Sequence, residues 1–262
     1  MNIAIVIPAR YGSTRLPGKP MVEVAGISLL ERVWRIAKAV EGVSAVHVAT
    51  DDQRVADHAA SFGANALMTP SDVATGTDRV RAALAVMEKR PDALINLQGD
   101  AVLTPPWVVQ ALAEAFHVDP QAGMVTAAVR CSWRQLAEIE ELKAQSPTSG
   151  TLVTMDRFGR ALYFSKAIIP YLRRKEFEVP PVHRHIGIYG YRAEILEKLA
   201  ELPQSPLEIA EQLEQLRALE NGIPIKVAVV DYRGRTHGSV DTPEDIPVVE
   251  DIIAREGELV AS

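Results

Sequence analysis

A repeated alternation over the first 130 residues constrains the fold of this chain most strongly: short apolar runs alternate with longer amphipathic stretches. The apolar runs are rich in valine, isoleucine and alanine, which predicts buried strands. They lie at residues 3–7, 45–49, 64–68, 93–97 and 124–129. The stretches between them predict helices at residues 29–40, 53–62, 78–89 and 106–116. This alternation is typical of an α/β doubly wound fold, a mostly parallel sheet with helices on both faces.

Sheets of this class bind their ligands at the carboxyl ends of the strands. We therefore expect the functional site in the loops that follow Ile7, Ala49, Met68 and Leu97.

After about residue 130 the pattern changes. A helix is predicted at 133–143 and is followed by apolar runs at 152–155 and 161–164 and by the alternating Ile186, Ile188 and Tyr191. These runs predict a small β-rich segment at about 150–200, either a subdomain or a dimerisation surface. Because no long linker or repeat interrupts the chain, we expect one catalytic domain over residues 1–262.

The last third predicts a helix opened by Ser205-Pro206, with Glu208 three residues after the cap, and closed by Asn221-Gly222. On one continuous helix, Glu208, Gln212 and Gln215 form a polar stripe, and Ile209, Leu213 and Leu216 form an apolar one. A strand at 225–230 and a final helix at 242–256 complete the prediction.

Charge and composition exclude several classes of protein. The net charge of −6 argues against a protein that neutralises nucleic-acid phosphates. The single cysteine, Cys131, cannot form an internal disulfide. The first apolar run is too short for an export signal, and no run is long enough to cross a bilayer. We therefore expect a cytoplasmic protein with no nucleic-acid or membrane partner.

The loop after the first predicted strand carries three cations, Arg10, Arg15 and Lys19, within ten residues. The two arginines offer forked donors to phosphate oxygens, and Gly12 lets backbone amides approach closely. The loop therefore predicts a triphosphate site, although a random basic loop is more often a solvated turn. The glycine spacing differs from a P-loop, and no strand is followed by the dinucleotide-binding pattern of dehydrogenases.

The segment Pro8-Ala9-Arg10-Tyr11-Gly12-Ser13-Thr14-Arg15-Leu16-Pro17-Gly18-Lys19-Pro20 closely resembles the opening signature of the CMP-Kdo synthetases, the 3-deoxy-manno-octulosonate (Kdo) cytidylyltransferases. Further matches follow in the family's order. They are Ala49-Thr50-Asp51, Thr75-Gly76-Thr77-Asp78-Arg79, Gln98-Gly99-Asp100, Ala161-Leu162-Tyr163-Phe164-Ser165, the stretch from His185 to Arg192, Ser205-Pro206-Leu207-Glu208, Glu214-Gln215-Leu216-Arg217 and Val240-Asp241-Thr242-Pro243-Glu244-Asp245.

The resemblance implies a fold of the nucleotide-diphospho-sugar transferase type, a homodimer, and Mg²⁺-dependent transfer of CMP from CTP to an acidic keto-sugar for lipopolysaccharide or other surface-polysaccharide synthesis. By the same resemblance, the phosphates would contact Arg10, Arg15 and Lys19. The rest of the nucleotide would contact Pro8, Ala9, Thr75, Gly76, Thr77, Arg79 and Gln98. The sugar acid would contact Lys166, His185, Tyr189, Glu214 and Gln215, and the metal would be held by Asp100 and Asp241.

Mg²⁺ prefers hard carboxylate oxygens and bridges substrate phosphates, so two distant aspartates suit it. Each also has a plainer interpretation, because Asp241 could cap the final helix and Asp100 could stabilise a turn. His183 and His185 could in principle form a metal pair, but with one cysteine a zinc site has little support. A structural or substrate-contact role is the better interpretation for these histidines.

The chain departs from the family at three places. Ala101-Val102 stands where the family usually has Glu-Pro, Ser149-Gly150-Thr151-Leu152 replaces an Asn-x-Val-Lys pattern, and Lys166 replaces an arginine. The last change keeps the charge but loses the bidentate fork. These departures suggest an altered acceptor, such as a modified octulosonate or a sialic-acid-like sugar. A non-catalytic nucleotide-binding homologue is the other alternative.

Overall fold

The computed structural model describes residues 1–13, 15–73 and 75–260, and these fall into two compact units. The first unit holds residues 1–113, 190–193 and the chain from 232 onward, and the second holds residues 114–189 and 194–231. The expectation of one catalytic domain over 1–262 stays a prediction. Within the described part of the chain, no helix combines the length and the apolar character that crossing a membrane requires.

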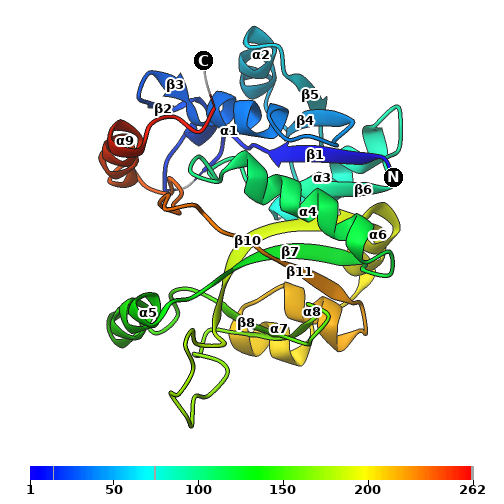
Figure 1. The fold of residues 1–262 in the computed structure, drawn as a ribbon. Coiled ribbons are helices and arrows are strands. Elements are labelled where there is room, and N and C mark those ends of the chain that lie inside the picture. The colour runs from blue at the N-terminus through cyan, green and yellow to red at the C-terminus, as the bar shows by residue number, and fades with distance from the viewer. Residues whose placement is uncertain (14, 74, 261–262) are drawn as a thin grey trace. The chain divides into compact units, whose positions relative to one another are not determined.

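Four parallel strands form the centre of the first unit, in the order β6-β1-β4-β5. They are β1 (Ile3–Pro8), β4 (Ala45–Thr50), β5 (Asn65–Met68) and β6 (Ala93–Asn96). Figure 1 shows α1 (Leu29–Lys38) and α2 (Gln53–Ser61) on one face of these strands and α3 (Gly76–Val86) on the other. Because both faces are covered, Ile3, Ile5 and Ile7 of β1 are fully buried.

A small hairpin and the last helix complete the first unit. The short 3-10 helix η1 (Lys19–Met21) precedes the antiparallel pair β2 (Glu23–Val24) and β3 (Ile27–Ser28). The turn between them has left-handed backbone at Ala25 and Gly26, with φ of 50° and 75°. The Ala25 N–H donates to Glu250 Oε1 at 2.9 Å and so joins the hairpin to α9 (Asp245–Glu256), which lies beside it in Figure 1. Helix α4 (Pro106–Val118) begins in the first unit and ends in the second.

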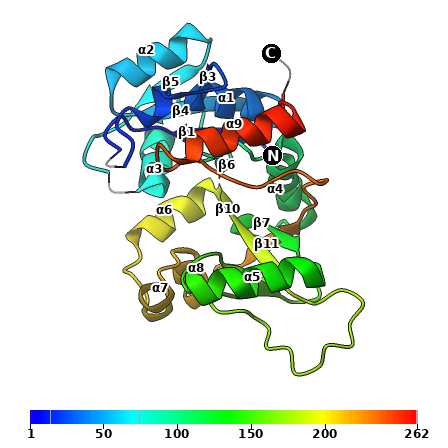
Figure 2. The ribbon, with the colours of Figure 1, turned by 90° about the vertical axis from the view of Figure 1, so that its left-hand side faces the viewer.

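The second unit is built around β7 (Met124–Arg130), which pairs in parallel with β11 (Ile225–Val229) and neighbours β10 (His183–Arg192). Strand β8 (Leu152–Met155) runs antiparallel to both β10 and β9 (Ala161–Ser165). A long loop joins β9 to β10 (Figures 1 and 2). The helices of this unit are α5 (Trp133–Gln145), α6 (Ala193–Glu201), α7 (Pro206–Glu211) and α8 (Gln215–Glu220).

The predicted α/β class and its mostly parallel strands are confirmed, and the predicted strands match within about two residues. Several helices differ from the prediction. Helix α6, whose buried Leu196 and Leu199 are three residues apart, was not predicted. The final helix begins at Asp245 and not at residue 242, and the Asp245 carboxylate accepts from the backbone N–H groups of Asp241 and Thr242 just ahead of it.

The predicted continuous helix from 206 to 221 is wrong. It is broken at Gln212, whose left-handed backbone (φ 55°, ψ 45°) ends α7 before α8 begins. The predicted stripes fail for the same reason: Ile209 is 54% exposed, while Gln215 is only 4% exposed.

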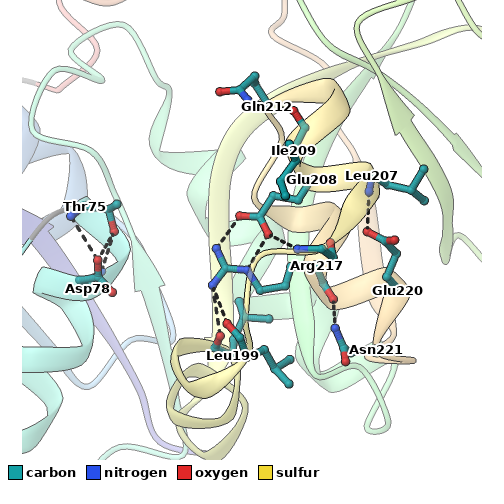
Figure 3. A network of polar contacts seen from close by, with 12 residues as sticks. Thr75, Asp78, Leu199, Leu207, Glu208, Ile209, Gln212, Arg217, Glu220 and Asn221 are labelled. Carbon is teal, nitrogen blue, oxygen red and sulfur yellow. Dashed lines mark hydrogen bonds and ion pairs between the residues drawn. The ribbon is translucent and has the colours of Figure 1, made fainter.

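A buried ion pair lies across this break. Arg217 of α8 donates from Nε and Nη2 to the two carboxylate oxygens of Glu208 in α7 (Figure 3). Glu208 Oε2 also accepts from the Ser205 N–H at 3.1 Å, as the sequence predicts for the start of this helix. The two side chains can meet in this way because the chain turns at Gln212.

Candidate nucleotide-binding site

The loop after β1 is held in a defined conformation. The Ala9 N–H donates to the Ala49 carbonyl at 2.8 Å, and the Gly18 N–H donates to the Tyr11 carbonyl at 3.0 Å. Gly18 has φ 68°, a left-handed conformation that glycine adopts without strain. The Arg54 guanidinium stacks over the Tyr11 ring, with its Cζ 3.5 Å from the ring centroid. The described part of this loop is therefore fixed by local contacts, while Arg10, Gly12 and Arg15 are exposed.

Lys19 joins the two aspartates that the sequence analysis singled out. Its Nζ lies 2.8 Å from Asp100 Oδ2 and 3.1 Å from Asp241 Oδ1. Arg15 Nη2 lies 2.9 Å from the same Asp241 oxygen. Asp241 therefore binds cations of the first loop, and α9 has Glu244 as its N-cap residue. The alternative interpretation of Asp241 as a helix cap is wrong.

These groups line a cavity of about 300 Å³ in the first unit. The cavity lies at the carboxyl ends of β1, β5 and β6, where a sheet of this class binds its ligands. It collects eleven of the predicted site residues: Pro8, Ala9, Arg10, Arg15, Lys19, Thr75, Gly76, Arg79, Gln98, Asp100 and Asp241. Thr77 is half-buried in α3 and is not among the described lining residues.

The wall formed by the start of α3 is fixed by a capping box. The Thr75 hydroxyl accepts from the Asp78 N–H, and the Asp78 carboxylate accepts from the Thr75 N–H. Gly76 lies against Gln98, since a Cβ added at this glycine would be 3.1 Å from Gln98 Oε1. Gln98 Nε2 in turn donates to Asn96 Oδ1 at 3.0 Å. The amide of Gln98 is thus oriented at the edge of the cavity.

Arg79 is the most buried of the cationic lining residues, at 3% exposure. Its Nη1 donates to the Thr69 hydroxyl at 2.7 Å, and its Nη2 lies 3.3 Å from Asp51 Oδ2. These bonds join α3 to the ends of β4 and β5, so Arg79 has a structural contribution in addition to its place in the cavity wall.

Sequence reasoning missed the contribution of Asp245. Its Oδ2 accepts from the Asp241 and Thr242 N–H groups, both at 2.8 Å. The hydrogen bond from Asp241, followed by that from Thr242, lowers the pKa of the Asp245 carboxyl. Asp245 thereby fixes the backbone that carries Asp241. The spacing of Asp241 and Asp245 ahead of an apolar helix was the sequence signal that could have indicated this contact.

The five residues predicted to contact the sugar acid lie in the second unit. Among them, His185 Nε2 lies 2.9 Å from the Thr126 hydroxyl, and its ring packs against Phe164 and Tyr189. Gln215 is buried, and its Nε2 has no hydrogen-bond partner among the described residues. The others are Lys166, Tyr189 and Glu214.

The aspartate pair has the donor chemistry of a magnesium site. Because one amine contacts both Asp100 Oδ2 and Asp241 Oδ1, the two oxygens face a common point. Two carboxylates with phosphate oxygens are the hard donors that Mg²⁺ prefers. An all-protein metal site would need at least three His, Cys, Asp or Glu side chains close together. No such group occurs among the described residues, so His183 and His185 belong to none.

Comparison with known proteins identifies the family. A model of the cytidylyltransferase family matches residues 4–227. The 3-deoxy-manno-octulosonate cytidylyltransferase of Maricaulis maris is 52% identical over 260 residues, which cover 99% of this chain and 100% of that protein. The 8-amino-3,8-dideoxy-manno-octulosonate cytidylyltransferase of Shewanella sediminis is 39% identical, over 97% of this chain and 99% of the relative.

Solved structures agree. The structure of CMP:2-keto-3-deoxy-manno-octonic acid synthetase complexed with CTP superimposes with a TM-score of 0.86 at 38% identity, covering 98% of this chain and 100% of the other. A cytidylyltransferase from Leptospira borgpetersenii, at 18% identity and a TM-score of 0.61, shares the fold over 97% of this chain and 87% of its own. The chain therefore belongs to the 3-deoxy-manno-octulosonate cytidylyltransferase family.

Proposed function

We propose that this protein transfers CMP from CTP to Kdo or to its 8-amino analogue and releases pyrophosphate. The names of its full-length relatives support both acceptors, since one relative acts on each. The observation that carries the proposal is the convergence of Asp100 and Asp241 on Lys19 inside a cationic cavity at the strand ends. Family membership over the whole chain favours turnover over the non-catalytic alternative.

In the proposed reaction, the anomeric hydroxyl oxygen of the sugar acid attacks the α-phosphorus of CTP. The new bond joins that oxygen to phosphorus, the bond from phosphorus to the bridging oxygen of pyrophosphate breaks, and the hydroxyl proton is released. Arg10, Arg15 and Lys19 would bind phosphate oxygens and stabilise charge that develops on the leaving group. Gln98, Gly76 and Thr75 would border the nucleoside.

Asp100 and Asp241 would hold a Mg²⁺ ion, which neutralises phosphate charge and acidifies a bound hydroxyl. Arg15 and Lys19 would then be released from the carboxylates and become available to the triphosphate. Asp245 would keep Asp241 in place, because it binds the backbone on which that carboxylate is carried.

The product, a CMP-activated sugar acid, is a donor for glycosyl transfer, and we propose that it serves lipopolysaccharide or other surface-polysaccharide synthesis in the cytoplasm. The homodimer expected from the resemblance is part of the same proposal, and light scattering coupled to gel filtration tests it.

The decisive experiment measures pyrophosphate release with CTP and Mg²⁺ across a panel of Kdo, 8-amino-Kdo and a nine-carbon sialic acid. We expect turnover with one of the first two. Asp100→Asn should lower kcat by about 100-fold or more while the Kd for CTP changes only a few-fold, as for a group acting mainly in the transition state. Asp251→Asn, on the exposed surface of α9, is the matched control. Near-normal turnover of Asp100→Asn would refute the metal assignment.

A further inference from the structure

The backbone of Lys166, the residue that follows β9, is held on both sides by charged side chains. Its N–H donates to Glu211 Oε2 at 2.8 Å, and its carbonyl accepts from Lys143 Nζ. Glu211 lies in α7 and Lys143 in the last turn of α5, both within the second unit. The strand end is therefore fixed by two helices.

Glu211 holds more than the one N–H. Its Oε1 accepts from the Ser165 hydroxyl at 2.7 Å, and the Ser165 Oγ accepts from the Ala167 N–H at 2.9 Å. Burial alone would raise the pKa of Glu211, but the hydrogen bonds from the Lys166 N–H and the Ser165 hydroxyl outweigh it and lower that pKa. The carboxylate is thus ionised, and it binds Ser165 and Lys166 directly and Ala167 through the Ser165 hydroxyl.

Lys143 donates to three backbone carbonyls, those of Ser149 (2.6 Å), Gly150 (3.0 Å) and Lys166. An ammonium group has three N–H donors, so each finds an acceptor here. Burial, and then the nearby positive charge of Lys166, lower the pKa of Lys143. The cation contacts the Ser149-Gly150 turn, which precedes β8 and belongs to the stretch that replaces the family's Asn-x-Val-Lys pattern. Lys143 of α5 therefore brings a positive charge to this turn.

We propose that Glu211 and Lys143 are positioning residues for acceptor binding: they fix the backbone of Lys166 so that its ammonium group can bind the carboxylate of the sugar acid. This inference rests on the proposed function and on the contact between Lys166 and the sugar acid that the family resemblance implies. Lysine is a flexible point charge, whereas the arginine usual at this position binds a carboxylate through a planar fork. Fixing the backbone at both amide groups removes backbone freedom and so partly offsets the freedom of the lysine side chain.

The test measures the KM for the sugar acid and for CTP separately, by pyrophosphate release. Glu211→Ala and Lys143→Met should each raise the KM for the sugar acid about 10-fold and leave the KM for CTP within about 2-fold. Glu211→Gln keeps one carbonyl oxygen as an acceptor and should give an intermediate value. Glu201→Gln and Lys198→Met change exposed residues of α6 and should leave both values unchanged.

A double-mutant cycle separates positioning from a general structural effect. In a Lys166→Ala background, Glu211→Gln should change the KM for the sugar acid less than about 2-fold, because two residues that act through one contact are not additive. Additive effects, or an equal rise in the KM for CTP, would overturn the inference. If Glu211→Ala does not fold, Glu211→Gln and Lys143→Met carry the same test.

The wild-type protein separates this inference from the proposed function. Wild-type turnover together with variants that keep the wild-type KM for the sugar acid would overturn the positioning role alone. Absence of wild-type turnover with both acceptors would overturn the proposed function and the inference that rests on it.

Discussion

Replacing Arg217 by methionine should destabilise the second unit strongly, because it leaves the Glu208 carboxylate buried without its partner. The side chains of Arg217 and Glu208 are only 15% and 5% exposed. After the change, the carboxylate keeps the Ser205 N–H among the bonds described here. Removing one member of a buried pair costs about 3–5 kcal/mol. Arg217 Nη1 also lies 3.4 Å from the Leu199 carbonyl at the end of α6, so that contact is lost as well (Figure 3).

Urea unfolding followed by circular dichroism measures this cost. In thermal unfolding of a protein of this size, the expected loss of free energy of unfolding lowers Tm by about 10 °C. The exposed pair of Arg255 and Asp251 is the matched control, and Arg255→Met should cost no more than about 0.5 kcal/mol. The double variant Glu208→Leu/Arg217→Met should recover most of the loss, because it leaves no unpaired buried charge. The reasoning is refuted if Arg217→Met costs no more than Arg255→Met.

The same pair predicts a pH dependence. Hydrogen bonds from Arg217 lower the pKa of Glu208 below its ordinary value of 4.5. A carboxyl group with a lowered folded-state pKa contributes stability that is present above the unfolded pKa and is lost as pH falls through the folded one. The difference in stability between the wild type and Arg217→Met should therefore be largest above about pH 5 and shrink below pH 4.5. A difference that grows on acidification would contradict this assignment.

Two further changes test the first unit. Asp245→Ala removes the acceptor for the Asp241 and Thr242 N–H groups, so the Mg²⁺ concentration for half-maximal rate should rise about 10-fold while kcat at saturating Mg²⁺ is largely kept. An unchanged Mg²⁺ titration would contradict it. Ala25→Asn converts the β2–β3 turn to Asn-Gly, which suits its two left-handed residues, and should raise the free energy of unfolding by about 0.5–1 kcal/mol in a urea titration. An unchanged or lower urea midpoint would contradict this prediction.

The strands and helices of the first 130 residues were predictable because each depends on local patterns. The apolar run of β1 predicts a strand that is buried on both faces. The helix α1 begins after Ser28, whose hydroxyl caps it by accepting from the Glu31 N–H. The break at Gln212 was not predictable from local pattern. Gln212 is an ordinary helix residue, and the pairing of Glu208 with Arg217 that accompanies its left-handed conformation joins residues nine positions apart.

The site shows the same division between local and distant information. The cationic loop is contiguous in sequence, and its phosphate-binding character follows from residue types alone. The link from Lys19 to Asp241 joins residues 222 positions apart, and no periodicity predicts it. Only the family resemblance indicated that Asp241 belongs with this loop. The role of Asp245 was missed because an aspartate near a helix start is first interpreted as a cap.

The charges of the cavity imply that nucleotide and metal bind cooperatively. Lys19 and Arg15 are engaged by Asp100 and Asp241, so a triphosphate would have to compete with these carboxylates for the two cations. That competition weakens when a divalent cation takes the two aspartates. By thermodynamic linkage, Mg²⁺ must then raise the affinity for CTP by the same factor by which CTP raises the affinity for Mg²⁺. We therefore expect the ion pairs of Lys19 to couple the binding of the two ligands, and equal affinity for CTP with and without Mg²⁺ would exclude this coupling.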